Sequence, residues 1–151
     1  MPNLARPIWV LALLAVVALA ACGSGGGSSG PGTFTTTYPP TASGDPVAVS
    51  LIDQAGVITG IDMAIGAAPV SGVEAVPGQP MTLRVSWVAG ECTDRVTMVL
   101  NSVGAGYEIT IHNHEGITAA GCTPADISRA LNVAFNKPVV PDQLAVTIQF
   151  P

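Results

Sequence analysis

The sequence has little charge of either sign and few aromatic side chains. Charged residues make up 10% of its 151 residues and aromatic residues 5%. Five lysine and arginine residues face ten acidic ones, which excludes a nucleic-acid binder built on a basic surface. A long disordered chain is also excluded, because such chains are polar and highly charged, whereas 48% of these residues are hydrophobic.

The sequence also lacks the patterns of long helices and of common enzyme sites. Seventeen glycines and thirteen prolines disfavour long helices, and no amphipathic helical run separates the apolar segments. A parallel α/β fold is therefore disfavoured. There is no P-loop and no pair of carboxylates at a catalytic spacing. We expect a protein that is not an enzyme and that needs no cofactor.

The longest apolar run lies at the start of the chain. Ile8 to Ala21 is continuous and follows a single charged side chain, Arg6. At about 14 residues the run is shorter than the roughly 20 that a membrane-spanning helix needs. It has the length of the apolar region of a secretory signal peptide. We expect residues 1–21 to be a signal peptide.

The end of this run, Leu19-Ala20-Ala21-Cys22, resembles the lipobox of bacterial lipoproteins. The resemblance implies cleavage after Ala21 and diacylation of the Cys22 sulfur with fatty acids such as palmitate. Two acyl chains are enough for stable anchoring. The expected location is therefore a bacterial cell membrane, on its extracytoplasmic side. An ordinary signal peptide cleaved at the same place, or an uncleaved membrane anchor, are the alternatives.

The next segment is rich in glycine, serine, threonine and proline. We expect residues 22–46 to be the lipidated cysteine and a flexible linker, because no apolar period of 2 or 3.6 is apparent there. A partner-binding segment around Tyr38-Pro39-Pro40 is the alternative reading of its centre.

Residues 47–151 read as short alternating runs separated by turn residues, and we expect them to form one domain. Asp53–Gly56 and Gly104–Gly106 are expected turns. About seven or eight runs of this kind predict an all-β, antiparallel β-sandwich. A brief run, Val73 to Val76, is one of them. In the other runs the apolar positions that share a face are Val47, Val49 and Leu51; Val57, Ile61, Met63 and Ile65; Met81, Leu83, Val85 and Trp87; Val96, Met98 and Leu100; Tyr107, Ile109 and Ile111; Leu131, Val133 and Phe135; and Leu144, Val146, Ile148 and Phe150.

Two further resemblances refine this class. The segment from Val76 to Pro80, leading into Thr82–Trp87, resembles strand-entry segments of immunoglobulin-like domains. It departs from antibody-type domains, in which the tryptophan lies between two core cysteines, because Trp87 precedes both Cys92 and Cys122. The order of Trp87, Cys92 and Cys122 with the closing strands is similar to small uncharacterised lipoproteins of actinobacteria. That family brings no assigned chemistry.

With Cys22 set aside, Cys92 and Cys122 are the remaining cysteines. In an oxidising compartment two such cysteines most simply form a disulfide. The closed loop of about 30 residues is expected to contribute roughly 3–4 kcal/mol. A redox-active pair is disfavoured because there is no C-x-x-C.

One cluster suggests chemistry. On a strand, Glu108, His112 and His114 share a face, so the two imidazoles and the carboxylate are weak candidates for a copper or zinc site. The polar outer face of a sheet is the simpler interpretation.

The sequence therefore predicts a non-catalytic binding or structural module of the envelope. It is membrane-attached through lipid on Cys22 and contacts an unidentified envelope protein or ligand, without binding nucleic acid. The alternatives are a metal-binding lipoprotein that uses His112 and His114, and an inhibitor of a secreted hydrolase that uses a loop such as Gly116–Gly121.

Overall fold

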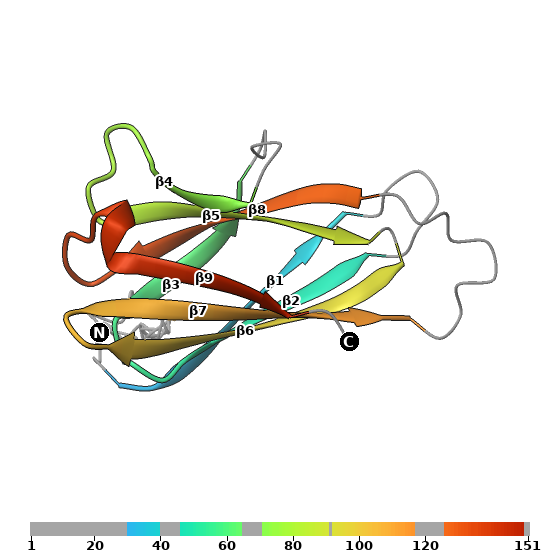
Figure 1. Cartoon of the computed structure of the whole chain (residues 1–151), viewed down its shortest axis with the longest axis horizontal. Coiled ribbons are helices and arrows are strands. Elements are labelled where there is room, and N and C mark those ends of the chain that lie inside the picture. The colour runs from blue at the N-terminus through green and yellow to red at the C-terminus, as the bar shows by residue number, and fades with distance from the viewer. Residues whose placement is uncertain (1–29, 40–45, 65–70, 91, 117–125, 150–151) are drawn as a thin grey trace, which may run out of the picture.

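The computed structural model describes residues 30–39, 46–64, 71–90, 92–116 and 126–149. In these residues the chain is almost entirely β, and Figure 1 shows the strands in two layers. One sheet has five strands in the order β1-β2-β6-β7-β9, and the other has four in the order β3-β8-β5-β4. The prediction of an all-β chain is confirmed, and its described strands form two sheets, as a sandwich requires.

The strands of the five-stranded sheet, called sheet A, are β1 (Gly32–Tyr38), β2 (Val47–Asp53), β6 (Thr93–Val103), β7 (Gly106–Glu115) and β9 (Leu144–Gln149). Those of the four-stranded sheet, called sheet B, are β3 (Ile58–Met63), β4 (Gly72–Ala75), β5 (Thr82–Gly90) and β8 (Asp126–Phe135). A short 3-10 turn, Pro141–Gln143, precedes β9.

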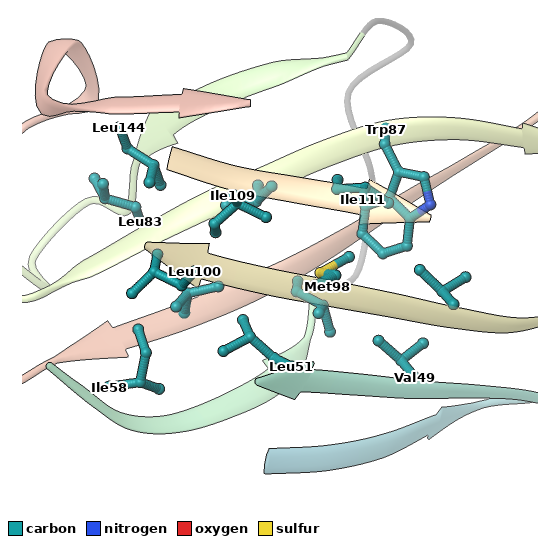
Figure 2. Close-up of a cluster of buried hydrophobic side chains, with 14 of the residues drawn as sticks. Val49, Leu51, Ile58, Leu83, Trp87, Met98, Leu100, Ile109, Ile111 and Leu144 are labelled. Carbon is teal, nitrogen blue, oxygen red and sulfur yellow. The ribbon is translucent and has the colours of Figure 1, made fainter. Parts of the chain in front are cut away.

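The alternation of side chains explains why these segments form strands with one buried face. On β2, Val47, Val49 and Leu51 are buried and the intervening residues are not. Successive side chains of a strand point to opposite faces, so each run supplies one apolar face to the space between the sheets. Figure 2 draws Trp87 of β5 and Ile111 of β7 among the side chains of this core. The expected core positions on β2, β6 and β8 are confirmed, as are Leu83, Val85 and Trp87 on β5 and Ile109 and Ile111 on β7. Met81 and Met63 were predicted to share these faces but are exposed, because Met81 precedes the start of β5 and Met63 is the last residue of the edge strand β3.

The described part of residues 47–151 holds eight strands, β2 to β9, in agreement with the seven or eight predicted there, and β1 is a ninth strand outside that range. The prediction that all strands are antiparallel was wrong, because sheet A is mixed: β2 pairs with β6 in parallel and β7 with β9 in parallel. These parallel neighbours are far apart in the chain and are joined through the other sheet. Alternation reveals which face of a strand is buried, but it carries no information on the direction of its neighbour.

The prediction that all of residues 22–46 form a linker does not hold for the middle of that segment. Its middle forms β1, which pairs along its whole length with β2. Phe34 and Tyr38 pack against the core, while Thr35 and Thr37 are exposed and Thr36 is half-buried. Threonine is a good strand former, and the inward aromatics give β1 a period of 2 that its polar composition concealed.

The two ends of the sandwich are distinct. The near end, where β1 begins, carries the turn after Asp53 and the β6–β7 hairpin. The buried Asp53 carboxylate accepts hydrogen bonds from the Gly56 and Ile58 N–H groups at 2.8 and 2.7 Å. The far end carries Tyr38, the last residues of β5 and β7, and the start of β8. Both predicted turns, Asp53–Gly56 and Gly104–Gly106, therefore lie at the near end.

Candidate functional site

The lipid attachment residue Cys22 and the second disulfide residue Cys122 lie outside the described residues. Cys92 is half-buried at the far end, between β5 and β6. Its carbonyl accepts a hydrogen bond of 3.0 Å from the N–H of Gly116, which follows β7. Of the loop proposed for hydrolase inhibition, only Gly116 is described.

The predicted metal candidates lie on the outer face of sheet A, but the structure does not gather them. Glu108 and His112 are four residues apart on β7, about 13 Å along an extended strand. The Glu108 Oε1 accepts a hydrogen bond of 2.8 Å from the Thr147 hydroxyl. Glu108 therefore has a different partner and is out of reach of both histidines.

The histidines themselves have ordinary neighbours on the sheet. A hydrogen bond of 3.3 Å joins His114 Nε2 to Thr97 Oγ1, and His114 lies beside Arg95 in the strand register. A neighbouring guanidinium disfavours a bound cation. Within the described ranges, no group of three or more His, Cys, Asp and Glu side chains is placed to hold a metal ion.

A different group of polar side chains lies inside the sandwich. Arg129 of β8 is only 4% exposed and lies opposite Trp87 of β5, on the face that packs against sheet A. Leu131, Val133 and Phe135 share this face, and Arg129, two residues before Leu131, lies on it as well. Arg129 was not singled out from the sequence, although its spacing of two residues from Leu131 placed it on the inward face.

Tyr38 closes the core beside this arginine. Its hydroxyl donates a hydrogen bond to the Ala130 carbonyl oxygen across the sandwich. Its ring meets Trp87 edge to face, with ring centroids 6.1 Å apart. Burial raises the pKa of the Tyr38 hydroxyl well above its ordinary value, and burial lowers the pKa of the Arg129 guanidinium. Arg129 is thus held in surroundings that disfavour its charge.

Several polar atoms of this region are buried without a hydrogen-bond partner. They are Arg129 Nη1, Trp87 Nε1, and both side-chain polar atoms of Asn113. Asn113 follows Ile111 by two residues on the inward face of β7, one step nearer the far end. Tyr38, Trp87, Asn113 and Arg129 are called here the far-end polar cluster. Buried Trp N–H and amide groups are nearly always hydrogen-bonded in native proteins.

No carboxylate pairs with Arg129 among the residues that the structure describes. The far-end polar cluster therefore presents a cation and several unused donors inside an otherwise apolar core. This arrangement suits the binding of an electron-rich group. It contains no side chain that acts as a nucleophile with an adjacent base.

In the described part of the chain no helix is both long enough and apolar enough to cross a membrane. Comparison of the chain with protein-family models, with curated proteins and with solved structures gave no match.

Proposed function

We propose that this chain is a lipid-anchored protein of a bacterial cell envelope, held on the extracytoplasmic side, whose sandwich is a non-catalytic binding module. The observation that carries the proposal is the Leu19-Ala20-Ala21-Cys22 motif, followed after a short glycine- and serine-rich segment by a folded domain. A lipid on Cys22 would anchor the protein in the membrane, and the two-sheet domain would serve as the scaffold of the binding module.

The early start of β1 sets how close the module lies to the membrane. Gly32, where β1 begins, is ten positions after Cys22 in the sequence. A flexible chain of that length has an end-to-end distance of roughly 16–19 Å. The near end would therefore face the membrane at short range. The far end, with the polar cluster, would face away from it.

A disulfide between Cys92 and Cys122 belongs to the same proposal. Cys92 lies where the chain passes from sheet B to sheet A, and residues 117–125 connect the two sheets in the opposite direction. The described ends of that connection both lie near Cys92. The N–H of Gly116 donates a hydrogen bond to the carbonyl oxygen of Cys92, and Asp126 is the strand partner of Gly90. Cys122 is four residues from Asp126, which is within about 14 Å of extended chain.

The finer description of the sandwich as immunoglobulin-like is also proposed. It is supported by the proline-containing segment that leads into β5, and by the fully buried Trp87 of β5. In immunoglobulin domains a buried tryptophan packs beside the disulfide. Here Trp87 precedes Cys92 by five residues.

Metabolic labelling with an alkyne fatty acid tests the anchor. The full chain is expressed in a bacterium, captured, and examined for label and for intact mass. We expect label on the parent and loss of residues 1–21, whereas Cys22→Ala has neither. Ser24→Ala, the matched control, keeps both. Label that persists in Cys22→Ala would contradict the anchor.

A further inference from the structure

The starting observation is the electrostatic state of Arg129. A buried charge is costly unless it is paired and hydrogen-bonded. Arg129 is 4% exposed, has an unpartnered Nη1, and pairs with no carboxylate among the described residues. Its neighbour Trp87, fully buried, also has an unpartnered N–H.

Most of the unused groups are hydrogen-bond donors. Arginine and the indole N–H are donors only, and the amide nitrogen of Asn113 adds two more donors, while Asn113 Oδ1 is an unpartnered acceptor. The hydroxyl of Tyr38 already donates to Ala130. A group that satisfies these donors must accept hydrogen bonds, and one that also compensates the guanidinium must be negatively charged. Charge-assisted bonds of arginine to carboxylate and phosphate oxygens are among the strongest hydrogen bonds in proteins.

We propose that the far-end polar cluster binds an oxyanion, a carboxylate or phosphate group of a ligand, with Arg129 as its main contact. This deepens, and rests on, the proposed role of the sandwich as a binding module. Arg129 lies three residues from the start of β8, about 10 Å from the far end of the sheet. With the near end tethered, that end is the one turned toward the surroundings.

The rival source of the anion is the chain itself. Asp45, Glu91 and Asp126 lie at sequence positions next to the far-end limits of β2, β5 and β8. Their side chains are outside the described residues. If one of them neutralises Arg129, the cluster is a structural ion pair and does not need a ligand.

The test uses the fluorescence of Trp87. The full chain carries Trp9→Phe, which leaves Trp87 as the single tryptophan. It is purified in a non-ionic detergent and titrated separately with inorganic phosphate and acetate at constant ionic strength set with chloride. We expect a saturable change in Trp87 emission with at least one of the two anions. Its absence with both anions would overturn the proposal.

Variants assign the response to the cluster. Arg129→Gln is expected to weaken binding about tenfold or more, as the loss of a charged hydrogen-bond partner does. Asn113→Leu, which keeps the arginine, is expected to weaken it several-fold. Arg95→Gln, a matched exposed arginine on the outer face of sheet A, leaves the titration unchanged. A response that survives Arg129→Gln in folded protein would also overturn the proposal.

A last set of variants tests whether an acidic side chain of the protein itself pairs with Arg129. Asp45→Asn, Glu91→Gln and Asp126→Asn are each expected to leave the phosphate and acetate titrations intact. If instead the parent shows no titration and one of these variants creates it, Arg129 is paired within the chain, and the ligand site is refuted. Fatty-acid labelling of Cys22 is independent of every result here, so failure of this proposal and failure of the anchor are distinguishable.

Discussion

The near end and the far end of the sandwich each bury a charged side chain, and their surroundings differ. At the near end, Asp53 is fully buried, and its two carboxylate oxygens each accept a backbone N–H, from Gly56 and Ile58. At the far end, Arg129 is almost as buried, but its Nη1 has no partner and no described carboxylate faces it.

The difference separates a charge that builds the fold from one that is available to a ligand. The Asp53 carboxylate ties down the turn that leads the chain from β2 in one sheet to β3 in the other. Its role is complete within the described residues. The Arg129 guanidinium contributes no described hydrogen bond that would offset the cost of burying it.

The largest expected effect is at the near end. Asp53→Ala leaves the buried N–H of Ile58 and the half-buried N–H of Gly56 without their acceptor, and we expect the free energy of unfolding to fall by about 3 kcal/mol. Chemical denaturation measures this change. Asp62→Ala, which removes an exposed carboxylate of β3, is the matched control and should change stability by less than about 0.5 kcal/mol. Equal effects of the two variants would contradict the structural role of Asp53.

The next effect tests how tightly the near end is packed. A Cβ at Gly106 would lie 2.5 Å from the backbone oxygen of Gln143, so Gly106→Ala should lower the free energy of unfolding by about 1–3 kcal/mol. At Gly72, nothing lies within 4 Å of such a Cβ. Gly72→Ala should therefore be neutral or slightly stabilising. A thermal melt of both variants checks the contrast.

A smaller effect is expected at the far end. Tyr38→Phe removes the hydroxyl that donates to Ala130 and keeps the ring against Trp87. The Ala130 oxygen still accepts the N–H of Ala64, so the expected loss is about 1 kcal/mol. A loss as large as that of Asp53→Ala would show that the far end is also built around one indispensable hydrogen bond.

The same hydroxyl predicts an alkaline weakening of the fold. Burial raises the pKa of Tyr38 in the folded protein above its unfolded value of 10.0. The folded state therefore holds this proton more tightly than the unfolded state. Its contribution is complete below pH 10 and is lost as the pH rises above that value. Between pH 8 and about 11, the free energy of unfolding should therefore fall less steeply with pH in Tyr38→Phe than in the parent, and denaturation curves at each pH measure it.

The strands of the core were predictable because each buries one face. Val47, Val49 and Leu51 alternate with less buried residues, as do the core residues of β6 and β7, and this period is visible in the sequence. The first strand was not predicted, because its inward aromatics are separated by threonines in a segment rich in linker residues. The parallel pairing of β2 with β6 depends on how the chain crosses between the sheets, which residue alternation does not encode.

The polar cluster was harder to predict than the strands. An arginine that follows the apolar alternation looks in sequence like the polar end of a strand. Its burial comes from the extension of β8 back to Asp126 and from Tyr38, which lies 92 residues away from Ala130 in the chain. The histidines were conspicuous for the opposite reason. Their residue types suggested a metal site. In the structure Glu108 accepts a hydrogen bond from Thr147 instead, and Arg95 is the strand neighbour of His114.

The most direct test of the contrast between the two ends is the unfolding free energy of Arg129→Met in chloride and in phosphate. Methionine fills similar space without the charge. In chloride the variant should be as stable as the parent or more stable, because an unpaired buried cation is removed. In phosphate the parent alone should gain stability, as a ligand that binds only the folded state requires. A variant that is several kcal/mol less stable in both salts, with no phosphate effect on the parent, would show that Arg129 is already paired and structural, like Asp53.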